Sequence, residues 1–289
     1  MSQKHRERAW RSSRAALRAV PYAELMSRDL RAATMLAADS ARPNRFHANI
    51  SEDWTIVHVF GGVLMYTALR AMSEVLTRDG FSLMSATALF LAPVPPGPLT
   101  IDVDVLRSGR RAAQLAADLV LPGNDTKALR VHAVFGAYHD IDFGFQDVEC
   151  PVVPSPNEVN VRRHSPLVHF NFDDRTEWRP VSGVGDLEGS RVLSWERLHV
   201  GGPDLMSLAL HSDVLGLAVE QRGPYTVLSL EIGIRFIHAP TTPWVLQEIY
   251  AWHVGDGYAT GPARLWDEDG RLCAIVTQTA QIRPAHSID

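Results

Sequence analysis

A carboxylate stands on the apolar side of a predicted helix. Ala209 and Leu210 lie one turn before Asp213. Gly216 and Leu217 lie one turn after it. Because residues one helical turn apart share a face, this pattern places the carboxylate among apolar side chains. Burial there costs several kcal/mol unless the carboxylate is hydrogen-bonded or used, so Asp213 is a candidate general base. The alternative is a buried aspartate satisfied by local backbone groups or a nearby arginine.

An amide side chain occupies a similar position on the last predicted strand. Alternate residues of a strand share one face. Gln278 is the only polar residue on a face otherwise formed by Leu272, Ala274, Val276, Ala280 and Ile282. Its counterpart in an earlier, similar segment is Val134 or Phe135, depending on one gap. We therefore interpret Gln278 as a second candidate site residue, with a buried amide that bridges strands as the alternative.

A serine and two adjacent glycines complete the candidate set. Ser229 shares a strand face with Val227, Glu231, Gly233 and Arg235. That composition alone is typical of a solvated face. Gly61 and Gly62 lie in a long apolar helix, near its start, where a backbone N–H group could stabilise an oxyanion. Tight packing of the helix against a sheet is the alternative.

Other residue types that carry chemistry show no comparable pattern. The two cysteines, Cys150 and Cys273, supply neither a disulfide framework nor a metal-ligand cluster. The histidines show no ligand spacing on any one predicted element, so we expect no metal site. The sequence contains no Gly-x-Ser-x-Gly nucleophile elbow, which argues against an α/β-hydrolase.

Charge and hydropathy exclude further classes of protein. The 289 residues include 28 Lys and Arg against 33 Asp and Glu, and the net charge of −5 argues against a broad nucleic-acid surface. No apolar run approaches the roughly 18 residues of a membrane span. The basic start of the sequence lacks the apolar core of a secretory signal. We therefore expect a cytoplasmic protein whose partners include neither nucleic acid nor membrane.

The candidate residues lie in two segments that repeat one order of elements. The first has an extended stretch at 45–50, a helix at 55–78 and strands at 83–91, 99–107, 112–120 and 128–137. The second has an extended stretch at 191–200, a helix at 204–221 and strands at 226–237, 244–254, 258–266 and 272–282. Alternating apolar residues predict the strands, and turn residues separate them. Each segment predicts an antiparallel sheet around one buried helix, an α+β architecture written twice.

The predicted organisation has five parts. They are an N-terminal extension that is partly disordered or helical (1–40), a first domain (41–137), a proline-rich connector (138–190), a second domain (191–284) and a tail (285–289). A single sheet of this kind exposes an edge that a partner sheet would cover. We therefore expect the two sheets to join edge to edge, with their helices side by side.

Several short motifs, taken in order, resemble one family. They are Trp54, Phe60-Gly61-Gly62, RTEWRPVSG at 175–183, Trp195-Glu196-Arg197, HSDVLG at 211–216, SLEIGIRF at 229–236 and RLWDEDGRLCAIVTQTAQIR at 264–283. From about residue 43 to 284 the chain resembles the acyl-CoA thioesterase II family. The resemblance implies a double hotdog fold, in which two tandem antiparallel sheets are each wrapped around a long central helix.

The resemblance also implies a reaction and its residues. It implies hydrolysis of an acyl-CoA thioester without metal or covalent cofactor, with acyl-CoA as the partner. In that family an Asp, a Thr or Ser and a Gln hold the attacking water, and the matching positions here are Asp213, Ser229 and Gln278. Expected substrate contacts are Gly61, Gly62 and His58. Candidate contacts for the CoA phosphates are Arg110, Arg111, Arg162, Arg163 and His164, with solvated charge as the alternative.

Two other functions remain open at this point. A hotdog enoyl-CoA hydratase uses an Asp and a His five residues apart, a separation that Asp53 and His58 share. The Asn-Pro that lies between the two residues in hydratases is absent here. A non-catalytic acyl-CoA-binding protein would keep the fold without the chemistry. Association into a homo-oligomer is compatible with each function.

The two segments are not chemically equivalent. Leu83 aligns with Ser229, and an apolar residue aligns with Gln278. The first segment therefore lacks two of the three polar residues that would hold water. We expect one active site per chain, built at the seam between the segments from residues of the second.

Overall fold

The structure is a computed structural model that describes residues 28–123, 125–165, 169–184, 189–219, 223 and 225–284. Residues 1–27 of the predicted extension and the predicted tail at 285–289 lie outside the described residues. The rest of the extension holds a short helix, α3 (Leu30–Ala33), and a two-residue strand, β1 (Ala37–Ala38). None of the described helices has the length and apolar character needed to cross a membrane.

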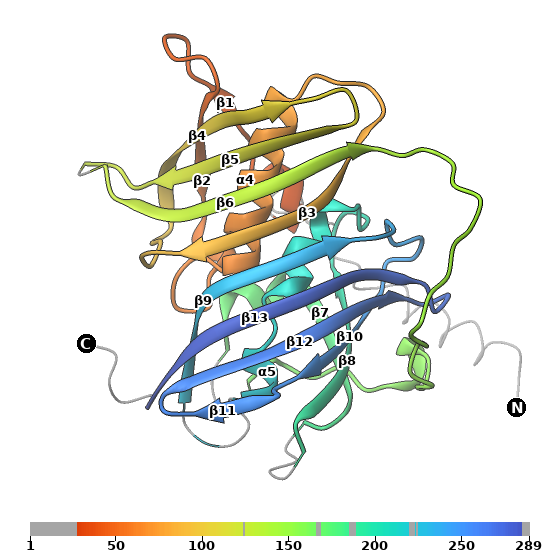
Figure 1. Ribbon diagram of the computed structural model, residues 1–289. Coiled ribbons are helices and arrows are strands. Elements are labelled where there is room, and N and C mark those ends of the chain that lie inside the picture. The colour runs from red at the N-terminus through yellow and green to blue at the C-terminus, as the bar shows by residue number, and fades with distance from the viewer. Residues whose placement is uncertain are drawn as a thin grey trace, which may run out of the picture.

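Thirteen strands form one continuous antiparallel sheet (Figure 1). After β1 they are β2 (Arg45–Ile50), β3 (Phe81–Phe90), β4 (Gly97–Ser108), β5 (Ala112–Val120), β6 (Lys127–Ala137), β7 (Thr176–Ser182), β8 (Arg191–Leu198), β9 (Tyr225–Phe236), β10 (Val245–Tyr250), β11 (His253–Gly255), β12 (Tyr258–Asp267) and β13 (Leu272–Pro284). Their order is β1-β2-β4-β5-β6-β3-β9-β13-β12-β10-β8-β7, and β11 pairs with β12. Every strand predicted in the two repeated segments is present, although 244–254 is divided into β10 and β11. A further strand predicted near 167–172 is not seen among the described residues, where a 3-10 helix begins at Asn171.

The two domains share this sheet through β3 and β9. Residues 85–89 pair antiparallel with residues 231–235, and the central pair is Thr87 opposite Gly233. The prediction of two sheets joined edge to edge is therefore confirmed. The pairing satisfies backbone groups that each domain alone would leave at an open edge.

The central helix of the first domain is α4 (Gly61–Val75). Ten of its 15 residues are buried, which explains why its sequence is apolar around most of its circumference. It lies behind the sheet in the view of Figure 1. The helix is shorter than the predicted 55–78, because residues 55–60 form a loop closed by a bridge between Thr55 and Val59. Just before that loop is a 3-10 turn, η1 (Glu52–Trp54).

In the second domain the predicted central helix is only partly visible, since it is interrupted and its last two residues, 220 and 221, lie outside the described residues. The predicted helix at 204–221 is a 3-10 helix, η4 (Met206–Ser212), followed by a four-residue helix, α5 (Gly216–Val219). The two are separated at Asp213, which has a ψ of 69°. Even so, η4 lies beside α4. The two are so close that a Cβ atom added to Gly62 would lie 2.6 Å from the Cα atom of Leu210.

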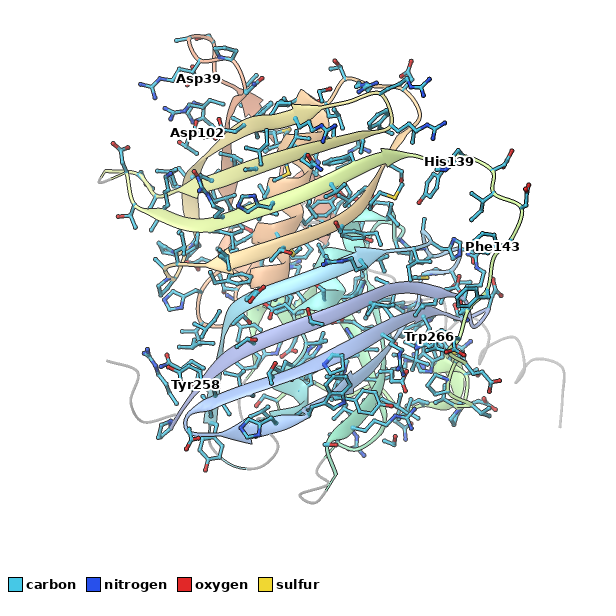
Figure 2. The ribbon with its side chains drawn as sticks, in the orientation of Figure 1. Asp39, Asp102, His139, Phe143, Tyr258 and Trp266 are labelled. Carbon is cyan, nitrogen blue, oxygen red and sulfur yellow. The ribbon has the colours of Figure 1, made fainter. Side chains whose placement is uncertain are left out.

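The connector contributes to the fold more than its composition predicts. It contains η2 (Pro156–Glu158), η3 (Asn171–Asp174) and β7, which pairs with β8 at the edge of the sheet. It also covers a second apolar cluster on the sheet, formed by Trp195, Trp244, Leu246, Trp266 and Leu272. Trp266 lies at the buried end of β12, and exposed Tyr258 lies at the other end (Figure 2). The predicted domain boundaries remain predictions.

Candidate active site

Asp213, Ser229 and Gln278 form one hydrogen-bonded cluster. Gln278 Nε2 donates to Asp213 Oδ1 and to Ser229 Oγ, each at 2.8 Å. Ser229 Oγ donates to Asp213 Oδ1 at 2.7 Å. The structure thus brings together three side chains from three separate elements of the second domain.

The chain leaves its helical path to place this carboxylate. Asp213 ends η4 with φ −90° and ψ 69°, which are not helical angles. The break leaves the next two N–H groups without helical acceptors. Gln278 Oε1 accepts both, from Val214 at 3.2 Å and from Leu215 at 2.9 Å. Because Oε1 accepts these bonds, the amide must turn its Nε2 toward Asp213 and Ser229.

Two glycines near the start of α4 face the same carboxylate. The N–H groups of Gly61 and Gly62 hydrogen-bond to Asp213 and favour its ionised form. A Cβ atom on Gly61 would overlap Asp213 Oδ2, so this approach requires glycine. Here these N–H groups bind the carboxylate, and their predicted contact with a substrate oxyanion stays a prediction.

Burial raises the pKa of Asp213 above its ordinary value of 3.8. Hydrogen bonds from Ser229, Gln278 and the two glycine N–H groups oppose this shift, but the loss of hydration outweighs them. An aspartate with a raised pKa is a stronger base than an exposed one. It therefore accepts a proton from water more readily.

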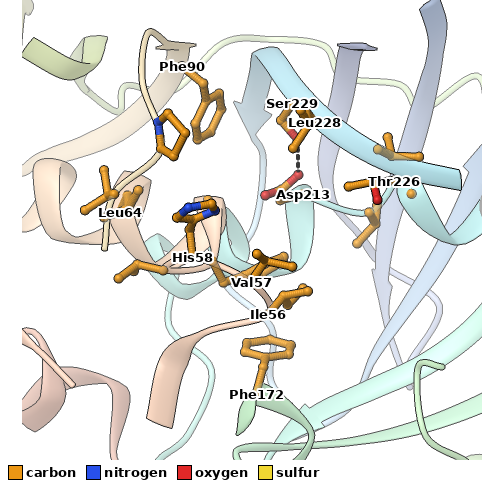
Figure 3. Close-up of a pocket in the computed structure, with 18 of the residues that line it drawn as sticks. Ile56, Val57, His58, Leu64, Phe90, Phe172, Asp213, Thr226, Leu228 and Ser229 are labelled. Atoms are coloured by element: carbon orange, nitrogen blue, oxygen red, sulfur yellow. Dashed lines mark hydrogen bonds between the residues drawn. The ribbon is translucent and has the colours of Figure 1, made fainter. Parts of the chain in front are cut away.

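The cluster opens onto a cavity of about 620 Å³ between the two domains. The first domain contributes residues 56–61 and 90–94, and the second contributes Asp213 and residues 226–230. Figure 3 shows the Asp213–Ser229 hydrogen bond beside the apolar side chains of this cavity. Gln278 does not line the cavity. It lies behind Asp213 and Ser229 and donates a hydrogen bond to each. Most of the lining is apolar, which suits an apolar ligand with a few oriented polar groups.

The alternative pair, Asp53 and His58, is not assembled on this cavity. His58 lines it and is drawn among the lining side chains in Figure 3. Asp53 does not line it, and its Oδ1 accepts a hydrogen bond from Arg175 at 2.7 Å. This separation argues against the hydratase reading.

Of the five residues predicted to contact the CoA phosphates, only His164 lines the cavity. The four that are exposed and do not line it are Arg110, Arg111, Arg162 and Arg163. His164 does line it, but its ring nitrogens contact Asp173 at 2.6 Å and Glu196 at 3.2 Å. Burial lowers the pKa of His164, but hydrogen bonds to these carboxylates outweigh burial and raise the pKa to about 9. Both N–H groups are therefore occupied within the protein, and a contact of His164 with the CoA phosphates stays a prediction.

Sequence reasoning missed the polar end of the cavity. Glu196 and Gln247, from neighbouring strands β8 and β10, line the cavity together with His164. Glu196 entered the sequence analysis only as part of a motif. A usable signal was present for Gln247, which interrupts the apolar face of Val245 and Ile249 in the same way as Gln278 interrupts its own. Across the described ranges, no group of three or more His, Cys, Asp or Glu has the geometry to hold a metal ion.

Matching bulges identify the counterpart of Ser229 in the first domain. The pairing of β3 with β6 skips Met84, and the pairing of β9 with β13 skips Leu230. A bulge shifts the register of every pair beyond it by one residue. Aligning the two bulges places Leu83 opposite Ser229, as predicted.

The same alignment corrects the counterpart of Gln278. Gln278 pairs with Ile232, and the first-domain equivalent of Ile232 is Ala86, which pairs with Ala133. Ala133 is therefore the counterpart, and the prediction of residue 134 or 135 was wrong because it did not include the bulge. The conclusion drawn from it still holds, since Ala133 is also apolar and buried.

Both domains match models of one family. Residues 50–136 match the acyl-CoA thioesterase N-terminal domain, and residues 147–282 match the acyl-CoA thioesterase C-terminal domain. Together the two matches span most of the chain in the expected order. The chain belongs to the acyl-CoA thioesterase family, and it is an enzyme that hydrolyses thioesters.

Solved structures show the same double hotdog fold. A hot dog protein of unknown function from Alicyclobacillus acidocaldarius has a TM-score of 0.78 at 22% identity, over 88% of this chain and 97% of its own. The tesB protein of Mycobacterium avium subsp. paratuberculosis has a TM-score of 0.73 at 19% identity, over 89% and 98%. The acyl-CoA thioesterase II TesB2 of Mycobacterium marinum has a TM-score of 0.71 at 19% identity, over 89% and 98%. No curated protein gives a significant match.

Proposed function

We propose that Asp213 is the general base for hydrolysis of acyl-CoA, with Ser229 and Gln278 as its supports. The observation that carries this proposal is the hydrogen-bonded cluster of the three side chains at the wall of an apolar cavity. A carboxylate with a raised pKa at an otherwise apolar surface is the arrangement that proton abstraction from water requires.

The proposed reaction is direct attack by water. Asp213 accepts a proton from a water molecule as the water oxygen bonds to the thioester carbonyl carbon. The carbon–sulfur bond then breaks, its electron pair leaves with the CoA thiolate, and the thiolate takes up a proton. Ser229 Oγ would help to orient the water, and its hydrogen bond to Asp213 Oδ1 at 2.7 Å supports this role. The thiolate is a good leaving group, so the reaction needs little acid assistance.

The substrate we propose is a medium- or long-chain acyl-CoA. The acyl chain would lie among apolar side chains from both domains, including Ile56, Leu64 and Phe90. Gly61, Gly62 and His58 would contact the thioester region, since all three line or adjoin the cavity beside Asp213. A role in fatty acid metabolism, a cytoplasmic location and association into a homo-oligomer belong to the same proposal.

One assay separates this function from its alternatives. Purified protein is given a saturated acyl-CoA and the matching enoyl-CoA, and the products are analysed with a thiol reagent and by mass spectrometry. Release of free CoA thiol is the expected result. Addition of water to the enoyl-CoA without thiol release would show a hydratase, and binding without either product would show a non-catalytic protein.

A further inference from the structure

A second polar cluster lies at the cavity, outside the proposed catalytic group. Glu196 is at its centre and is only 3% exposed. Its Oε1 contacts His164 Nε2 at 3.2 Å. Its Oε2 contacts His211 Nδ1 at 2.8 Å and accepts a hydrogen bond from Gln247 Nε2 at 2.6 Å. His164, Glu196 and Gln247 line the same cavity as Asp213, so a ligand in that cavity meets both clusters.

Packing alone does not account for this cluster. Burying ionised groups is costly, and apolar residues of similar volume would often be as stable or more stable. The surrounding cavity is built from such residues, among them Phe170 and Phe172. The ring of His164 packs against Phe172 with a centroid separation of 5.8 Å. Phe172 therefore lies at the polar end of the cavity. In Figure 3, Ile56 and Val57 lie between Phe172 and Asp213.

The cluster has hydrogen-bonding capacity that the described chain does not use. An ionised carboxylate offers about four lone-pair positions, and Glu196 uses three, with only one on Oε1. The Nε2 atom of His211 is buried and has no hydrogen-bond partner among the described residues. His211 is 1% exposed and precedes Asp213 by two residues. The open position on Glu196 is an acceptor, so the group that completes the cluster must donate a hydrogen bond.

We propose that this end of the cavity binds a hydroxyl group on the acyl chain, so that the enzyme prefers hydroxylated acyl-CoA over unsubstituted acyl-CoA. This inference rests on the proposed function, since it specifies the substrate of the same site. The hydroxyl donates to Glu196 Oε1. Protonated His164 balances only one of the two negative charges of Glu196 and Asp173, so a carboxylate at the same place would be repelled and a dicarboxylic acyl-CoA should be a poor substrate.

The test compares CoA esters of one chain length in the wild-type enzyme. The panel holds octanoyl-CoA, its isomers with one hydroxyl at positions that do not cyclise, the methoxy form of the best isomer, and the dicarboxylic analogue. We expect at least one hydroxy isomer to have a kcat/KM about 10-fold above that of octanoyl-CoA, as a hydrogen bond to a charged group provides. The methoxy form should lose this advantage, because it is polar but donates no hydrogen bond.

Two results would overturn the inference without touching the proposed function. One is that octanoyl-CoA is hydrolysed as fast as every hydroxy isomer, and the other is that the methoxy form matches the hydroxy form. Thiol release from none of the esters would instead reject the proposed function. In that event, calorimetry with the thioether analogues of the same panel measures the affinity for each acyl group directly. Equal affinities for the hydroxylated and unsubstituted analogues would overturn the inference.

A matched pair of variants assigns the preference to Glu196. Glu196→Gln removes the charge and should bring the ratio of hydroxylated to unsubstituted kcat/KM close to one. Glu177→Gln is the control, because Glu177 is also a buried carboxylate, paired with Arg179 and Arg197, and does not line the cavity. It should leave the ratio unchanged. An unchanged ratio in a folded Glu196→Gln would count against Glu196 as the acceptor.

Discussion

At the scale of single residues, the chemistry depends on how burial and hydrogen bonding compete at Asp213. Two side chains and two backbone N–H groups stabilise the ionised carboxylate, yet burial still raises its pKa above 3.8. Hydrogen bonds of this kind normally lower the pKa of a carboxyl group. The net effect is a carboxylate that is anchored in position and has a raised pKa, which are the properties that the proposed base needs.

The pH dependence of the reaction follows from this balance. Asp213 must be ionised to act as a base, so activity should be lost as the pH falls through its pKa in the free enzyme. Because that pKa is raised, the acid limb of kcat/KM should lie at higher pH than the 3.8 of an ordinary aspartate. A profile of kcat/KM against pH, with a substrate that does not titrate in the range, measures this. An acid limb at or below 3.8 would contradict the account.

Gln278 should be needed for stability as well as for activity. Gln278→Ala leaves the buried N–H groups of Val214 and Leu215 without an acceptor, at a cost of about 1–3 kcal/mol for each unsatisfied group. It also removes two donors to Asp213 and Ser229, so turnover should fall sharply. Chemical denaturation and steady-state kinetics measure the two effects.

Gln278→Glu keeps an acceptor for both N–H groups but places a second carboxyl group beside Asp213. Because two adjacent buried carboxyl groups do not both ionise near neutral pH, they share a proton and Asp213 no longer acts as a free base. The variant should therefore be nearly inactive. Full activity in either variant would remove Gln278 from the site.

At the scale of elements, the break between η4 and α5 shows a feature that the periodicity of apolar residues cannot predict. An apolar stripe through 209–217 fits a helix equally well whether or not the helix is broken. The break depends on Gln278 Oε1, which accepts the N–H groups of Val214 and Leu215 from a strand more than 60 residues further along the chain. Only the tertiary structure brings that acceptor into place.

The two glycines at the start of α4 should fail in different ways when each is replaced by alanine. In Gly61→Ala the new methyl group meets the Asp213 carboxylate, so turnover should fall more than stability. In Gly62→Ala it meets the backbone of Leu210 and Ala209, with the Cα of Leu210 at 2.6 Å, so α4 and η4 must move apart. Overpacking of this kind costs about 1–3 kcal/mol. Kinetics and thermal unfolding of both variants measure the contrast, and identical profiles would refute it.

At the scale of the whole molecule, much of the architecture follows from sequence, and the exceptions have physical causes. The strands and the joined sheets were predicted, because alternating apolar residues report directly on a half-buried sheet. Asp213 and Gln278 were found because each interrupts an apolar face. The strand β7 and the Glu196 cluster were missed, because they depend on how the connector packs against distant strands.

We expect duplication followed by divergence to give one productive site per chain. Leu83 and Ala133 replace Ser229 and Gln278 in the first domain, so that domain has no equivalent cluster to hold water. Calorimetric titration with a non-hydrolysable thioether analogue of acyl-CoA should therefore give one bound molecule per chain. Two equivalent sites per chain would show that the domains have not diverged in this way.

The most direct test of the central claim is the turnover of Asp213→Asn with an acyl-CoA that the wild type hydrolyses. Asparagine keeps the size of the side chain but cannot accept the proton, so turnover should fall by about 100-fold or more. Because the pKa of Asp213 is raised in the folded protein, its ionised form lowers stability at neutral pH, and the variant should remain folded. Circular dichroism and thermal unfolding check that. A folded Asp213→Asn enzyme with near-wild-type turnover would contradict the claim that Asp213 activates the water.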